Sequence, residues 1–155
     1  MTVRPYREPD IATLAALFTE SVHTLASAYY DESQLAAWAP RPPDLPMWRH
    51  RLSSVRTLVA EVDAHPVGFI SYEENGHIDL LYTSPAHARM GIATTLYSHT
   101  EALLIAHGVT EAFTEASLVA RPFFERRGFE VTEEQYVQLR GVTFQRFAMR
   151  KALRT

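Results

Sequence analysis

Apolar residues recur at helical spacing over the first part of the chain. Beyond Pro9 they return every three or four positions and predict an amphipathic helix, with an apolar face formed by Ile11, Leu14, Ala15, Phe18, Val22 and Leu25. Asp31 and Gln34 stand three positions apart, which is the pattern of a capping box, and they predict a second short helix that runs through Trp38. Pro40 ends this helix and is the first of four helix-breaking prolines, with Pro42, Pro43 and Pro46, and one further helical turn fits residues 48–52.

The pattern changes to short β-rich runs in the middle of the chain. Strands are predicted over residues 57–62, 67–72 and 77–83, with another short strand over residues 2–6. Asn75-Gly76 precedes the run at 77–83, and this dipeptide favours a tight hairpin because both positions adopt positive φ. We therefore expect three antiparallel strands in this region.

Helices and strands alternate in the C-terminal half. The remaining elements are predicted as helix 91–107, strand 110–116, helix 119–127, strand 130–139 and strand 142–149. Gly108 and Gly128 stand where the two helices end. The strand at 77–83, the long helix and the strand at 110–116 form a βαβ crossover, whose two strands are parallel. The fold class is α/β (α+β), a mixed and mostly antiparallel sheet with one central parallel crossover, in the order β α α β β β α β α β β.

The length and composition of the chain predict a single domain over residues 1–155. The chain has 155 residues, of which 46% are hydrophobic and 21% charged, values that support one compact core. It contains no Cys. This excludes a disulfide scaffold, a thiolate-ligated zinc site and any mechanism that holds an acyl group on a cysteine.

Charge and motif spacing narrow the classes of partner. The sequence pI is about 6.1 and Lys and Arg form no run, so a nucleic-acid surface is not expected. The N-terminus lacks the apolar core of a signal peptide, and the longest apolar runs are too short to cross a bilayer, so we expect a cytoplasmic protein with no membrane partner. The seven His show no metal-binding spacing, and no metal is expected.

The turn after the strand at 77–83 is a candidate anion site. Residues 85–93 supply a loop, a Gly at position 91 where backbone can approach a ligand closely, and then the free N–H groups of a helix N-terminus. A phosphate group fits such a place. Spacing alone leaves a second interpretation open, in which Gly91 serves only the turn between strand and helix.

Two stretches of the sequence resemble the GNAT superfamily of acyl-CoA-dependent N-acyltransferases, and the order of elements agrees over essentially the whole chain. The pyrophosphate loop of that family is Arg or Gln, two residues, Gly, one residue, then Gly or Ala. Here it ends in Gly91-Ile92-Ala93 but begins with Ala88. The second stretch, residues 116–129, looks like the family segment of a small or amide residue, Ala, an aromatic pair and Gly-Phe.

The resemblance implies a site for acetyl-CoA as co-substrate. In the family the sheet splays between the strands that correspond to 77–83 and 110–116, and the acyl-CoA arm occupies the gap. The residues that this assigns to cofactor binding are Leu81, Tyr82, Thr83, Arg89, Met90, Gly91, Ile92, Ala93, Thr94, Ser117 and Phe124. Phe124 stands where many members carry a Tyr that protonates the departing thiolate, and Phe cannot donate a proton.

His77 and Asp79 are the candidate catalytic residues. Strand alternation puts them on one face together with Leu81 and Thr83. An amine is protonated at neutral pH, and an imidazole with an ordinary pKa of about 6.5 is suited to accept its proton. The alternative for His77 is a solvated side chain after a hairpin. For Asp79, recognition of the substrate ammonium, a water-mediated base role and a structural hydrogen bond all remain open.

The expected reaction is direct transfer of an acetyl group to a primary amine of a small molecule or peptide in a ternary complex, since no Cys is available. The resemblance assigns the acceptor pocket to the N-terminal helices, with His23, Tyr29, Tyr30 and Trp38. A non-catalytic acyl-CoA-binding regulatory module of the same fold is the alternative, and a homodimer stays open. A nucleotide-binding half-domain is disfavoured because the chain lacks G-x-G-x-x-G.

Overall fold

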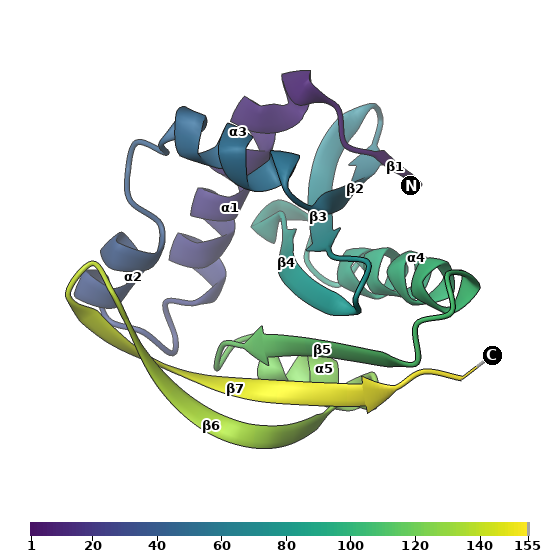
Figure 1. The fold of residues 1–155 in the computed structure, drawn as a ribbon. Coiled ribbons are helices and arrows are strands. Elements are labelled where there is room, and N and C mark those ends of the chain that lie inside the picture. Colours follow the sequence, from purple (N-terminus) through teal and green to yellow (C-terminus); the bar gives the residue numbers. More distant parts are fainter. Residues whose placement is uncertain (155) are drawn as a thin grey trace.

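Seven strands form one sheet in the computed structural model, which describes residues 1–154 (Figure 1). The spatial order is β1-β2-β3-β4-β5-β7-β6. The strands are β1 (Thr2–Pro5), β2 (Arg56–Val62), β3 (His65–Tyr72), β4 (His77–Thr83), β5 (Glu111–Ala116), β6 (Glu130–Leu139) and β7 (Val142–Ala152). Only β4 and β5 pair in parallel, and the other neighbours are antiparallel. The predicted fold class is confirmed.

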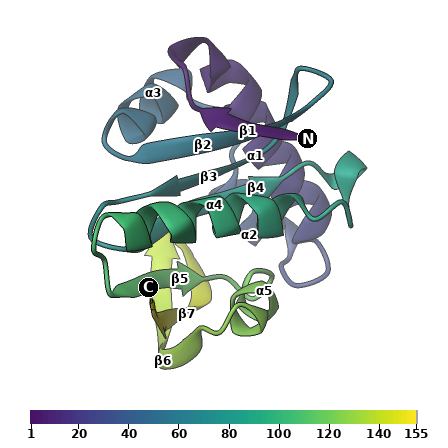
Figure 2. The ribbon, with the colours of Figure 1, turned by 90° about the vertical axis from the view of Figure 1, so that its right-hand side faces the viewer.

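Helices cover both faces of this sheet (Figures 1 and 2). The α-helices are α1 (Ile11–Leu25), α2 (Glu32–Trp38), α3 (Leu45–Ser53), α4 (Ile92–Ala106) and α5 (Arg121–Arg126), and two short 3-10 turns lie at Glu8–Asp10 and Pro85–His87. Helices α1, α2 and α3 contribute to one apolar core, to which the sheet contributes Phe69 and Leu80 among other residues. Helices α4 and α5 contribute to a second core, which includes Ile70 and Ile78. No helix within residues 1–154 is long and apolar enough to cross a membrane.

The cap residues explain where two of the N-terminal helices begin. Oδ1 of Asp31 accepts a hydrogen bond from the backbone N–H of Gln34 at 2.8 Å, and Oε1 of Gln34 accepts one from the N–H of Asp31 at 3.0 Å. This is the predicted capping box. Asp44 caps α3 in a similar way, and Pro46 lies in the first turn of that helix. Proline is favoured at this position because an N–H there would have no intrahelical acceptor. Pro46 therefore lies within α3, which extends beyond the single turn predicted over residues 48–52.

The contact between α4 and the sheet depends on Gly68 in β3. A Cβ atom at this position would lie 2.6 Å from Cγ2 of Ile92, which is the first residue of α4. Such an approach is closer than van der Waals contact allows, so any larger residue would push α4 outward. Gly68 therefore determines how close the N-terminus of α4 lies to the sheet.

The two parallel strands separate after a short paired segment. Only His77 with Phe113 and Ile78 with Thr114 are in register, and Oγ1 of Thr114 donates a hydrogen bond to the carbonyl of Ile78 at 2.9 Å. Beyond these pairs β4 and β5 diverge, as the family resemblance implies. The backbone edges that face each other across the gap are available to a ligand.

A β-bulge at Asp79 changes which side chains share a face of β4. Ser71 pairs with Leu80 and Tyr72 pairs with Ile78, so Asp79 is an extra residue in its strand. Ile78 and Leu81 consequently pack on the side of α4, whereas Leu80 packs on the side of α1. The prediction that His77, Asp79, Leu81 and Thr83 share one face of the strand is wrong, because the bulge interrupts the alternation of side chains.

Candidate active site at the strand splay

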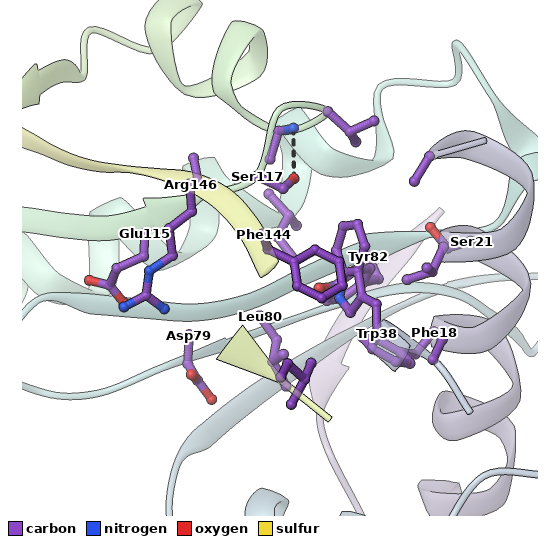
Figure 3. Close-up of a pocket in the computed structure, with 18 of the residues that line it drawn as sticks. Phe18, Ser21, Trp38, Asp79, Leu80, Tyr82, Glu115, Ser117, Phe144 and Arg146 are labelled. Carbon is purple, nitrogen blue, oxygen red and sulfur yellow. Dashed lines mark hydrogen bonds between the residues drawn. The ribbon is translucent and has the colours of Figure 1, made fainter. Parts of the chain in front are cut away.

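A cavity of about 510 Å³ opens where β4 and β5 separate (Figure 3). Its walls come from all of the α-helices except α4, from the strands β4, β5, β6 and β7, and from the loop after α2. This volume lies within the roughly 300–1,000 Å³ that is typical of small-molecule sites. The cavity has a charged end, near the last paired residues of β4 and β5, and an aromatic end (Figure 3).

Asp79 lines the charged end of the cavity. Its carboxylate accepts two hydrogen bonds from Arg51 on α3, at 3.3 Å from Nη2 and 3.4 Å from Nε. The side chains of Arg51 and Asp79 are 41% and 21% exposed. The bulge explains why a charged residue in a central strand is tolerated, since it leaves Asp79 out of the regular ladder and beside the cavity.

Aromatic rings form the opposite end. Tyr82 packs edge to face against Phe18 with 4.6 Å between ring centroids, and Trp38 packs in the same way against Tyr30 at 5.3 Å. Phe144 of β7 lies against both Trp38 and Tyr30. Burial raises the pKa of Tyr82 to about 12, so its hydroxyl is protonated at neutral pH.

His77 does not line the cavity, and its surroundings do not fit the predicted role of proton acceptor. Its Nδ1 lies 2.7 Å from Oε1 of Glu73 and its Nε2 lies 2.8 Å from Oε1 of Glu115. A carboxylate only accepts hydrogen bonds, so both ring nitrogens donate and the ring is an imidazolium. The bond to Glu115 is the main cause that raises the pKa of His77 to about 9, with Glu73 adding to it. An already protonated ring cannot take a proton from an amine at neutral pH.

Glu115 is a cavity residue that sequence reasoning missed. It follows Thr114 in β5 as Asp79 follows Ile78 in β4, so the two carboxylates come directly after the last paired residues of the parallel strands. The hydrogen bond from His77 lowers the pKa of Glu115, with a further contribution from Arg146. The signal in the sequence was a charged residue in a central strand, which is the same signal that identified Asp79.

The loop before α4 has two residues with a positive φ. Gly91 adopts φ +71° as the N-cap residue of α4, and Arg89 also has a positive φ of 65°. No side chain caps the helix, and residues 88–91 are exposed. The first N–H groups of α4, which lack intrahelical partners, are thus open to a ligand.

Comparison with known proteins now gives the family. The sequence model of the acetyltransferase (GNAT) domain matches residues 26–151. The uncharacterized N-acetyltransferase YafP of Escherichia coli is 36% identical over 148 residues, which cover 96% of this chain and 93% of that protein. The chain belongs to the GNAT acetyltransferase family.

Solved structures of GNAT proteins agree with the fold. A GCN5-related N-acetyltransferase from Rhodopseudomonas palustris superposes with a TM-score of 0.94 at 35% identity, over 98% of this chain and 95% of that one. The PaiA N-acetyltransferase of Thermoplasma acidophilum, solved in complex with coenzyme A, superposes with a TM-score of 0.75 at 20% identity, over 98% and 99% of the two chains. The second likeness shows the shared fold alone.

The cofactor-binding residues expected from the GNAT resemblance fall into two groups. Leu81, Tyr82, Thr83, Ser117 and Phe124 line the cavity at the splay. Arg89, Met90, Gly91, Ile92, Ala93 and Thr94 belong to the loop and first turn of α4, outside the cavity lining. An uncapped helix N-terminus beside two unpaired strand edges suits a ligand with a phosphate group and an extended amide-containing arm, so the residues present fit acetyl-CoA.

Two of these cavity residues have local structural partners. Oγ of Ser117 accepts a hydrogen bond from the N–H of Ala120 at 3.1 Å, at the start of α5. Phe124 is 2% exposed and packs against the rings of Tyr97, Phe123 and Phe129. Its ring forms part of a buried aromatic cluster as well as of the cavity wall.

Two of the four expected acceptor residues line the cavity and two do not. Tyr30 and Trp38 line the cavity, and the hydroxyl of Tyr30 accepts a hydrogen bond from the N–H of Leu118 at 3.0 Å. His23 and Tyr29 do not line the cavity: the ring of His23 bonds the carbonyl of Ala39 through Nε2 at 2.8 Å, and Tyr29 is 54% exposed. The family resemblance assigned all four to one pocket, but Tyr29 lies in the turn after α1 and is exposed. Within residues 1–154 no cluster of His, Asp and Glu could hold a metal ion.

Proposed function

We propose that this GNAT protein transfers the acetyl group of acetyl-CoA directly to a primary amine of a small molecule or peptide in a ternary complex. The observation that carries the proposal is the splay of β4 from β5, which leaves two free backbone edges beside a cavity with carboxylates at one end. The acetyl-CoA supplies the activated thioester when it is bound. The absence of Cys supports direct transfer, because no thiol of this chain can hold the acetyl group.

The residues that would hold acetyl-CoA lie on both sides of the gap. The N–H groups at the start of α4, beyond Gly91, would take the pyrophosphate, because a helix N-terminus carries partial positive charge. The backbone of β4 from Leu81 to Thr83 would bond the pantetheine arm. An N–H near Leu81 is the proposed donor to the oxyanion of the tetrahedral intermediate, a type of interaction worth about 2.7–4 kcal/mol in other acyl-transfer enzymes.

Asp79 is the proposed proton acceptor in place of His77. It lines the cavity, and its hydrogen bonds to Arg51 are long, so its carboxylate is accessible to an ammonium group. The ammonium gives one proton to Asp79, and the neutral nitrogen then forms a bond to the acetyl carbon. The carbon–sulfur bond breaks, the nitrogen gives up its second proton and the departing thiolate takes up one, so that one proton is released to solvent for each amide formed. Tyr82 and Ser117 are hydroxyl donors in the same cavity, and the raised pKa of Tyr82 keeps its proton in place at neutral pH.

A melting experiment with coenzyme A tests the binding half of this proposal. A ligand that binds only the folded state at a hundred times its Kd stabilises it by about 2.7 kcal/mol, which raises Tm by roughly 5–10 °C in a domain of this size. Gly91→Val should abolish the shift. A Cβ at Gly91 meets no atom within 4 Å, so the variant is destabilised only by the backbone strain of a positive φ, about 1–2 kcal/mol.

Gly108→Val is the matched control, because Gly108 has a similar φ of +78° and equally open space at the other end of α4. It should lower Tm in the same way and keep the shift with coenzyme A. A shift that survives in Gly91→Val would contradict the loop assignment. Release of free thiol from acetyl-CoA with a panel of amines tests the catalytic half, and binding without release for any amine would identify a regulatory module instead.

A further inference from the structure

Charged side chains from four different elements line the same end of the cavity. They are Arg51 from α3, Asp79 from β4, Glu115 from β5 and Arg146 from β7. Figure 3 shows Glu115 and Arg146 beside each other and Asp79 below them, all on the side of the cavity away from the aromatic rings. Two positive and two negative groups thus meet at this end, from segments that are far apart in the sequence. Arg140, the third arginine of the lining, donates a hydrogen bond to the carbonyl of Ala37.

The ion pair between Arg51 and Asp79 is loose. Its nitrogen-to-oxygen distances are 3.3 and 3.4 Å, whereas Arg4 and Asp10 in the same protein form a two-pronged pair at 2.8 Å for both bonds. Charge-assisted bonds of this kind normally measure about 2.7–2.9 Å. Because Arg51 and Asp79 do not satisfy each other fully, each can bind a further charged group.

Glu115 and Arg146 each form a hydrogen bond with another neighbour. Oε1 of Glu115 bonds to His77 at 2.8 Å, and Nε of Arg146 donates to Oε1 of Gln135 at 2.8 Å. Within residues 1–154 Arg146 makes no ion pair. The bond to His77 uses Oε1 of Glu115 and the bond to Gln135 uses Nε of Arg146, so within residues 1–154 Oε2 of Glu115 and the terminal nitrogens of Arg146 remain as charged atoms at this end of the cavity.

We infer that the acceptor is a zwitterion, an α-amino acid whose ammonium lies at Asp79 and Glu115 and whose carboxylate lies at Arg51 and Arg146. This rests on the proposed acetyl transfer. A simple cation would meet two arginines and a simple anion would meet two carboxylates, so like charges disfavour both. A zwitterion matches all four groups, with no net charge brought into the cavity.

The other end of the cavity indicates the class of side chain. Trp38, Tyr82 and Phe144 line it with apolar ring surface. Apolar area that leaves water on binding contributes about 25 cal/mol per Å², so an aromatic or large aliphatic side chain gains most from this wall. The inferred acceptor class is a free amino acid with such a side chain.

The test compares two amines that differ only in the carboxylate. L-phenylalanine and 2-phenylethylamine are supplied with acetyl-CoA, and thiol release gives kcat/KM for each. We expect the amino acid to be preferred by about 10- to 100-fold, the range for hydrogen bonds between charged groups. Arg51→Gln and Arg146→Gln should each reduce this preference about tenfold or more, whereas Glu115→Gln should lower kcat/KM for both amines.

Arg49→Gln is the control. Arg49 lies two positions before Arg51 on α3, but its side chain is 59% exposed, pairs with Glu8 and does not line the cavity, so the preference should be unchanged. If wild-type protein acetylates 2-phenylethylamine as fast as L-phenylalanine or faster, the zwitterion inference is overturned while acetyl transfer stands. No thiol release with any amine, together with an intact melting shift from coenzyme A, would overturn both.

Discussion

Substitution of His77 probes the ion cluster beside the splay. The imidazolium lies between the carboxylates of Glu73 and Glu115, stacks on Phe113 with 4.9 Å between ring centroids, and has a side chain only 16% exposed. His77→Gln keeps a side chain with one donor group but removes the positive charge. We expect it to destabilise the protein at neutral pH, since two carboxylates then lose their shared counter-ion.

The size of this effect follows from the pKa of His77, which the two carboxylates raise from 6.5 to about 9. A difference of one pKa unit corresponds to about 1.36 kcal/mol, so 9 minus 6.5 gives an upper value of roughly 3.4 kcal/mol. The side chains of Glu73 and Glu115 are 45% and 31% exposed, and solvent screening reduces the expected contribution to about 2 kcal/mol. The lowered pKa of Glu115 reflects the same interaction and is not added to it.

The effect should depend on pH with a defined sign. Folding raises the pKa of His77, so the folded protein binds this proton more tightly than the unfolded chain does. The stabilisation is complete below pH 6.5 and is lost as pH rises through about 9. Urea denaturation of wild type and His77→Gln between pH 5.5 and 10 should show a difference in the free energy of unfolding that shrinks by about 2 kcal/mol over this range.

His107→Gln serves as the control, because His107 is an exposed imidazole at the end of α4 that bonds only the carbonyl of Leu103. Its effect should stay within about 0.5 kcal/mol at each pH, as for most surface substitutions. If the difference for His77→Gln does not change between pH 5.5 and 10, the assignment of an imidazolium between two carboxylates is refuted.

Two further substitutions test the site itself. Asp79→Asn keeps the shape of the side chain and should lower kcat/KM by about 10²–10⁴ while the melting shift with coenzyme A stays, and a variant with unaltered kcat/KM would remove Asp79 from the mechanism. Phe124→Tyr should keep or raise the rate of thiol release, since Phe124 lines the cavity and a hydroxyl there can protonate the thiolate, at a cost in unfolding free energy of about 1–3 kcal/mol for the buried ring. A large fall in rate with coenzyme A binding intact would show that this position serves packing alone.

Features that depend on neighbouring residues were predictable from the sequence. The capping box of Asp31 and Gln34 and the hairpin between β3 and β4 arise from contacts within a few positions, although the turn has a positive φ at Gly76 and not at Asn75. The strand order around the parallel crossover followed from the family resemblance and from the handedness of βαβ units. The third N-terminal helix was underestimated, since Pro46 was interpreted as a breaker although it lies in a first turn.

The charged site was decided by tertiary structure, because it depends on register between distant segments. The extra residue in β4 is visible only once β3 is aligned beside it, and Asp79, which borders the cavity, is that residue. The sequence could not show that His77 is an imidazolium for the same reason. Glu115 is 38 positions away and reaches its ring only when β4 and β5 pair. Hydrogen bonds and ion pairs act over a few ångströms in space, whereas sequence patterns report only on positions close along the chain.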